Sequence, residues 1–105
     1  MGTRAVAETI LEQLGGVRRL QLMTGARDFV GGEAFGRGFV QFKIGRGARD
    51  GINKVRIELD PSDTYTVKFY QTRGQGFRYA GEVPGVYCDT LVSVFEARTG
   101  LRLSL

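Results

Sequence analysis

Histidine is absent from this chain of 105 residues, and cysteine occurs once, as Cys88. Without histidine, the sequence lacks the commonest general base and the commonest zinc ligand of proteins. A single cysteine excludes an intramolecular disulfide and fits a reducing compartment. The longest apolar runs span only a few residues, too short for a transmembrane helix. We therefore expect no membrane partner and no disulfide framework.

The sequence also lacks a recognisable catalytic or cofactor-binding motif. The stretch Gly36-Arg37-Gly38 is followed by Gln41 where a dinucleotide fingerprint places its third glycine, and no Gly-Lys-Ser/Thr occurs. The turn from Asp60 to Asp63 fits ordinary hairpin chemistry better than a hard-cation site. Cys88 lies next to the apolar stripe of a predicted helix, which favours a half-buried structural thiol. We predict a protein that is not an enzyme and holds no cofactor or metal.

Composition favours one globular domain over residues 1–105. Hydrophobic residues make up 42% and charged residues 25%, close to the globular average. The formal net charge of +4 favours polyanionic partners. Arg4, Glu8 and Glu12 stand where a secretory signal needs an apolar stretch, so we expect a cytoplasmic protein.

Apolar residues at helical spacing predict two helices. The first follows Thr3, a suitable N-cap residue, and ends at Gly15-Gly16, which supply a left-handed stop. The second has an apolar stripe from Val86 to Arg98, with Pro84 near its start and Gly100 just past its end.

Between these helices, strict two-residue alternation predicts four strands, each with one apolar face. They are Arg18–Thr24, Phe39–Ile44, Ile52–Leu59 and Thr64–Tyr70. The Gly25–Gly38 and Gln71–Gly81 stretches are rich in glycine and are predicted as loops. The tail, Leu101–Leu105, either forms a short edge strand, which would allow two chains to pair, or packs against the body.

This order predicts an α+β fold of the arrangement α-β-β-β-β-α. The four strands form an antiparallel meander, joined by the Asp60–Asp63 turn and a looser Gly45–Gly51 hairpin. Both helical stripes need burial, and the apolar face of the sheet is the only large surface available. We therefore predict a two-layer sandwich with both helices on one face and the other face open.

Basic side chains gather on the predicted open face. Positive charge that follows phosphates, with aromatic rings that stack on bases, is what single-stranded nucleic-acid binding requires. We therefore predict non-enzymatic binding of single-stranded nucleic acid. A solvated face that is basic only for solubility is the alternative interpretation. The predicted binding residues are Arg19, Lys43, Lys54, Arg56 and Lys68 on phosphates, with Tyr70 or Phe39 for stacking.

Four aromatic residues fall in the predicted loops, namely Phe29, Phe35, Phe77 and Tyr79. Either they hold the loops against the body of the protein, or they form an exposed apolar patch. Such a patch would make the protein an interaction module for another protein.

Three segments of the chain resemble a family of small uncharacterised proteins carried by bacteriophages and mobile elements. They are Gly25–Ile44, Ile52–Asp60 and the closing stretch from Gly85 to Leu101, which together cover most of the chain. The resemblance implies no activity and no functional residue. It implies a bacterial host cytoplasm and a gene among replication, recombination or host-takeover functions. Nucleic acid, or a host protein that the chain modulates, would then be the partner.

Overall fold

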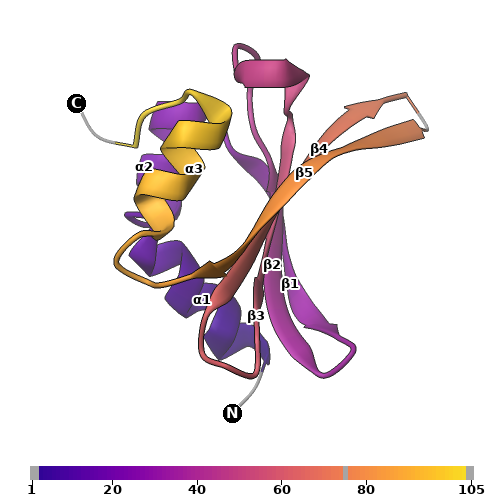
Figure 1. The fold of residues 1–105 in the computed structure, drawn as a ribbon. Coiled ribbons are helices and arrows are strands. Elements are labelled where there is room, and N and C mark those ends of the chain that lie inside the picture. The colour runs from indigo at the N-terminus through magenta and orange to yellow at the C-terminus, as the bar shows by residue number, and fades with distance from the viewer. Residues whose placement is uncertain (1–2, 75, 104–105) are drawn as a thin grey trace.

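The computed structural model describes residues 3–74 and 76–103 and contains three α-helices, one 3-10 helix and five strands in that part of the chain. Figure 1 shows the three α-helices on one side of the sheet, and its other side uncovered. The elements are α1 (Thr3–Gln13), α2 (Val17–Thr24), β1 (Arg27–Ala34), β2 (Arg37–Lys43), η1 (Arg49–Gly51), β3 (Lys54–Leu59), β4 (Tyr65–Arg73), β5 (Gly76–Val86) and α3 (Leu91–Thr99).

The sheet is an antiparallel meander in the order β1-β2-β3-β4-β5. The predicted α+β class, with helices at both ends of the chain, is confirmed. The predicted strand count is wrong, because the sheet has five strands, and a further helix precedes the first of them.

The segment Arg18–Thr24, predicted as a strand, is helix α2. Leu20 is fully buried whereas Leu22 is 76% exposed, so the two leucines do not share a face. Thr24, one helical turn after Leu20, is buried and its hydroxyl donates to the Leu20 carbonyl oxygen at 2.6 Å. Gly25 ends the helix in the left-handed conformation. Arg19 consequently belongs to the helical layer and not to the sheet.

The glycine-rich segment Gly25–Gly38, predicted as a loop, is mostly strand β1 and the start of β2. Two of its glycines lie under α1. A Cβ atom on Gly31 would come within 2.8 Å of the Ala7 Cβ, and one on Gly38 within 2.8 Å of Val6. Glycine is needed there because the helix backbone lies so close to the strands.

The second predicted loop, Gln71–Gly81, is also mostly strand. β4 continues to Arg73, and β5 runs from Gly76 through Pro84 to Val86. The pairing shifts between Phe69 and Tyr70, opposite Gly81, whose φ is +119°. A bulge at glycine and a proline are both tolerated here because β5 is an edge strand.

The last helix begins later than predicted. α3 starts at Leu91 and not near Val86, and Gly100 ends it in the left-handed conformation as expected. Cys88 therefore precedes the helix, and it is exposed, not half-buried.

The core lies between the helices and the inner face of the sheet. The predicted inner faces of three strands are confirmed, because Val40, Phe42, Val55, Ile57, Val67 and Phe69 are at most 1% exposed. The space above them is filled by Ile10 of α1, by Leu14 just after that helix, and by Leu91 and Phe95 of α3.

The tail packs against the body of the protein. Leu103 is buried, and its amide donates to a carboxylate oxygen of Glu96 at 2.8 Å. Residues 101–103 form no strand, so the described part of the tail offers no edge for pairing with a second chain; residues 104–105 of the predicted segment lie outside the described residues.

Candidate functional site

The register of the sheet brings six of the seven predicted binding residues to the uncovered face. Residues that are directly opposite in neighbouring antiparallel strands point to the same face. The opposed pairs on this face are Phe39 with Glu58, Gln41 with Arg56, Lys43 with Lys54, Lys54 with Tyr70, and Arg56 with Lys68. Only Arg19 is misplaced, since it lies in α2.

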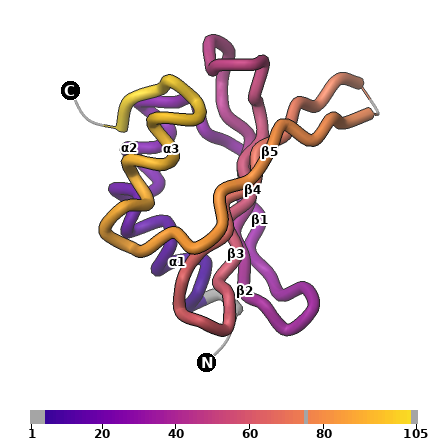
Figure 2. The backbone as a smooth tube through the Cα atoms, in the orientation of Figure 1, coloured from indigo at the N-terminus to yellow at the C-terminus, as the bar shows by residue number. Residues whose placement is uncertain are grey.

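This face is hollowed. The β1–β2 and β4–β5 hairpins diverge as they leave the body of the protein, as both views show (Figures 1 and 2). Between them lies a hollow of about 800 Å³, with Phe35 from one hairpin and Phe77 from the other among its lining residues. The rest of the lining is Ala34, Arg37, Gln41, Lys43, Lys54, Arg56, Glu58, Lys68, Tyr70, Thr72, Gly74 and Gly76.

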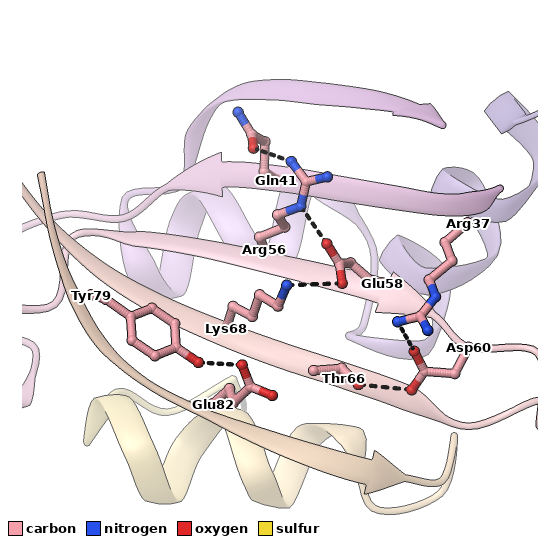
Figure 3. A network of polar contacts seen from close by, with 9 residues as sticks. All are labelled: Arg37, Gln41, Arg56, Glu58, Asp60, Thr66, Lys68, Tyr79 and Glu82. Atoms are coloured by element: carbon pink, nitrogen blue, oxygen red, sulfur yellow. Dashed lines mark hydrogen bonds and ion pairs between the residues drawn. The ribbon is translucent and has the colours of Figure 1, made fainter. Parts of the chain in front are cut away.

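Glu58 joins two of the cations on the floor of the hollow (Figure 3). Arg56 Nε donates to Glu58 Oε2 at 2.8 Å, and Lys68 Nζ lies 3.1 Å from Glu58 Oε1. Burial alone would raise the pKa of the Glu58 carboxyl. The hydrogen bonds and charges of Arg56 and Lys68 outweigh burial, so the pKa lies below its ordinary value. Glu58 is thus held as a carboxylate between two cations.

Arg56 is fixed from three sides. Besides its bond to Glu58, Nη1 donates to Gln41 Oε1 at 3.1 Å, and the guanidinium lies over the Phe39 ring, 3.7 Å from the centroid. The predicted stacking residue Phe39 therefore already stacks on an arginine. Among the described residues, no cation lies over the ring of Tyr70, the other member of the predicted pair.

Tyr70 belongs to an aromatic cluster with two residues of β5. Its ring centroid lies 5.8 Å from that of Phe77 and 5.6 Å from that of Tyr79. Phe77 is 72% exposed and Tyr79 is 49% exposed. Tyr79 donates its hydroxyl to Glu82; burial, followed by this bond and the charge of Glu82, raises the pKa of Tyr79 to about 12. Three rings thus stand together beside the cations.

The four aromatics predicted as one protein-binding patch do not form one surface. Phe29 is partly buried on the core side of the sheet, and its ring centroid lies 5.4 Å from that of Phe42. Phe35 is fully exposed in the turn between β1 and β2. Phe77 and Tyr79 stand on the other hairpin with Tyr70. Their alternate positions, 77 and 79, were a signal in the sequence that they share one face of a strand.

The remaining cations of the hollow differ in their partners. Arg37 pairs with Asp60 at 3.1 Å, and Thr66 also donates to Asp60 (Figure 3). Lys43 lies 3.6 Å from Asp28. Within the described residues, Lys54 has no acidic group at ion-pair distance. Neither Arg37 nor Gln41 was predicted as a binding residue, because Arg37 falls in the predicted Gly25–Gly38 loop and Gln41, although it lies in a predicted strand, carries no charge.

Over residues 3–74 and 76–103, no group of three or more potential ligand side chains could hold a metal ion, and no helix is long and apolar enough to cross a bilayer. Comparison of the chain with family models, with curated proteins and with solved structures found no match.

Proposed function

We propose that this protein is a non-enzymatic module that binds single-stranded nucleic acid in the hollow of its uncovered sheet face. The location of the net charge carries the proposal. Five of the fifteen lysines and arginines line the hollow, with one of the eleven acidic residues. The formal charges of the other ten basic and ten acidic residues, which do not line the hollow, cancel. The whole formal excess of +4 therefore lies around one concave surface.

A basic face that served only solubility would not need this concentration of charge in a hollow. Surfaces that stay soluble without a charged ligand usually mix the two signs. Clefts lined by one sign of charge focus the electrostatic potential and attract ligands of the opposite sign. The charge distribution thus favours an anionic ligand over the solubility interpretation.

The aromatic residues favour a single strand over a duplex. Tyr70 and Phe77 stand next to the cations, and Phe77 is largely exposed. Unpaired bases can stack on such rings while the phosphates contact lysine and arginine. In a duplex the bases already stack on each other, so no base face is exposed for these rings to stack on. Lys43, Lys54, Arg56 and Lys68 would contact phosphates.

Fluorescence anisotropy tests this proposal with labelled single-stranded DNA, single-stranded RNA and duplex DNA at two salt concentrations. We expect binding of a single strand that weakens steeply with salt. Lys43→Glu/Lys54→Glu should abolish it. Arg18→Glu/Arg19→Glu carries the same change of charge in α2, outside the hollow, and should bind nearly as well as the wild type. No binding at low salt, or equal losses in both variants, would overturn the proposal.

A second candidate is binding of a host protein, in the bacterial cytoplasm that the sequence resemblance implies. Phe35 and Phe77 support it, because both are strongly exposed and line the hollow from separate hairpins. Exposed aromatics of this kind anchor protein interfaces. Such binding would depend on Phe35 and change little with salt, which distinguishes it from binding of a nucleic acid.

A further inference from the structure

One cross-strand row on the uncovered face spans all five strands. Its successive partners are Arg27, Lys43, Lys54, Tyr70 and Tyr79. Directly opposed side chains in antiparallel strands stand about 4.5–5.5 Å apart at Cβ. Three cations therefore stand side by side in neighbouring strands, followed by two aromatic rings.

This row is poorly neutralised. Among the described residues, the only carboxylate at ion-pair distance from the three cations is that of Asp28, 3.6 Å from Lys43. Both of these side chains are largely solvated, at 44% and 62% exposure, so the pair is weak. Like charges that face each other across a strand pair destabilise a sheet. The row thus lowers the stability of the free protein, and a bound anion would relieve the repulsion.

The neighbouring row shows the contrast. Arg56 and Lys68 also face each other, but both contact Glu58. That carboxylate neutralises them in part, so the floor around it attracts phosphate less strongly. An incoming phosphate is therefore directed toward the row without a comparable acid, where Lys54 is next to Tyr70.

We propose that this row is a phosphate subsite, in which a phosphate group lies between Lys43 and Lys54 and the base attached to it stacks on Tyr70. This proposal deepens the proposed function and depends on it for the identity of the ligand. A phosphate from nucleic acid and one from a free polyphosphate share the chemistry that the two lysines recognise. Only the former brings a ring for Tyr70.

Thermal unfolding of Lys54→Gln and Lys68→Gln, without ligand and at low salt, tests the repulsion. Lys54→Gln should raise Tm by about 1–4 °C, because it removes an opposed like charge. Lys68→Gln should lower Tm, because it removes a partner of Glu58. Arg18→Gln serves as the control for net charge. A decrease in Tm for Lys54→Gln, or a rise no larger than that of Arg18→Gln, would overturn the proposal.

Sodium tripolyphosphate and a labelled oligonucleotide then test the ligand. Tripolyphosphate should raise the Tm of the wild type and of Arg18→Gln, and should raise that of Lys54→Gln by less than half as much. Equal increases in all three would overturn the subsite. If tripolyphosphate raises the Tm of Lys54→Gln less than that of the wild type but no oligonucleotide binds, the subsite stands and the proposed function fails. If Lys54→Gln binds an oligonucleotide as tightly as the wild type does, the subsite fails while the proposed function stands.

Discussion

The guanidinium of Arg56 lies 3.7 Å above the ring centroid of Phe39, on the neighbouring strand. The same group donates to Glu58 and to Gln41, so its plane is held by a ring on one side and by acceptors at its edge. A lysine could not make this set of contacts, because it lacks the planar fork. Phe39 thus positions a cation, whereas Phe77, exposed on the opposite hairpin, has a ring that a ligand can reach.

Leucine substitutions at these two aromatic positions should separate the two roles. Phe39→Leu should lower the free energy of unfolding by about 1 kcal/mol, since the cation–π contact is lost. Phe77→Leu should leave stability within about 0.5 kcal/mol but weaken binding of a single strand roughly 5-fold or more, since stacking is lost. Urea denaturation and anisotropy measure the two effects. The same pattern in both variants would contradict the assignment.

Removal of the carboxylate at Glu58 should tighten nucleic-acid binding. Glu58→Gln releases Arg56 and Lys68 from their common partner, so both should attract phosphates more strongly. We expect affinity to rise several-fold, while the free energy of unfolding falls by about 1–3 kcal/mol because charge-assisted hydrogen bonds are lost. Glu82→Gln makes the same change of charge at a residue that does not line the hollow, and it should alter affinity less. Weaker binding by Glu58→Gln would contradict this account of the hollow.

The stability that Glu58 contributes should disappear in acid. The pKa of Glu58 is lowered from 4.5 in the folded protein, so its contribution is fully present above the unfolded pKa and is lost as the pH falls through the folded pKa. The difference in the free energy of unfolding between wild type and Glu58→Gln should be constant from about pH 6 to 7 and shrink below about pH 4. Chemical denaturation across this range measures it. A difference that did not change with pH would show that the charge of Glu58 contributes nothing.

A methyl group at Gly31 should separate α1 from the sheet. Gly31→Ala places a Cβ 2.8 Å from that of Ala7, an atom fixed to the helix backbone, so the helix must shift. We expect a loss of about 1–3 kcal/mol in the free energy of unfolding. Gly76→Ala is the matched control, because its Cβ would meet nothing nearer than 3.7 Å. Equal effects of the two substitutions would exclude close packing as the cause.

The central strands could be predicted from the sequence because their two faces differ so clearly. In β2, β3 and β4 the apolar residues alternate with polar ones, and burial follows that alternation except at Glu58, Leu59 and Thr66. The same alternation fixed which cations share the uncovered face. That Lys43, Lys54 and Tyr70 share this face followed from the periodicity, whereas their direct pairing depends on the register of the strands.

The errors came from short or glycine-rich segments. In α2, the eight residues from Val17 to Thr24 fit both a period of two and a helical period, and only the packing of Leu20 and Thr24 distinguishes them. In β1 and β5, glycines interrupt the alternation of apolar and polar residues, so these segments were predicted as loops. Gly31 is there for the close approach of α1, and Gly81 for a bulge. These reasons depend on tertiary neighbours that local pattern does not reveal.

The hollow itself was not predictable from the sequence. It requires the two outer strands, β1 and β5, which lie wholly or partly in segments predicted as loops, and the twist that separates the two hairpins. The ion-pair partners of the cations could not be predicted from the sequence either, because the pairing of Glu58 with Arg56 and Lys68 depends on side-chain geometry across two strands.

The location of the bound strand tests the account most directly. We would titrate ¹⁵N-labelled protein with a short single-stranded DNA at low salt and follow the backbone amide signals by NMR. The account predicts shifts that cluster in β2–β5 around Lys43, Lys54, Tyr70 and Phe77 and that reverse when salt is added. Shifts centred on α1, α2 or α3, or no shifts at all, would contradict it.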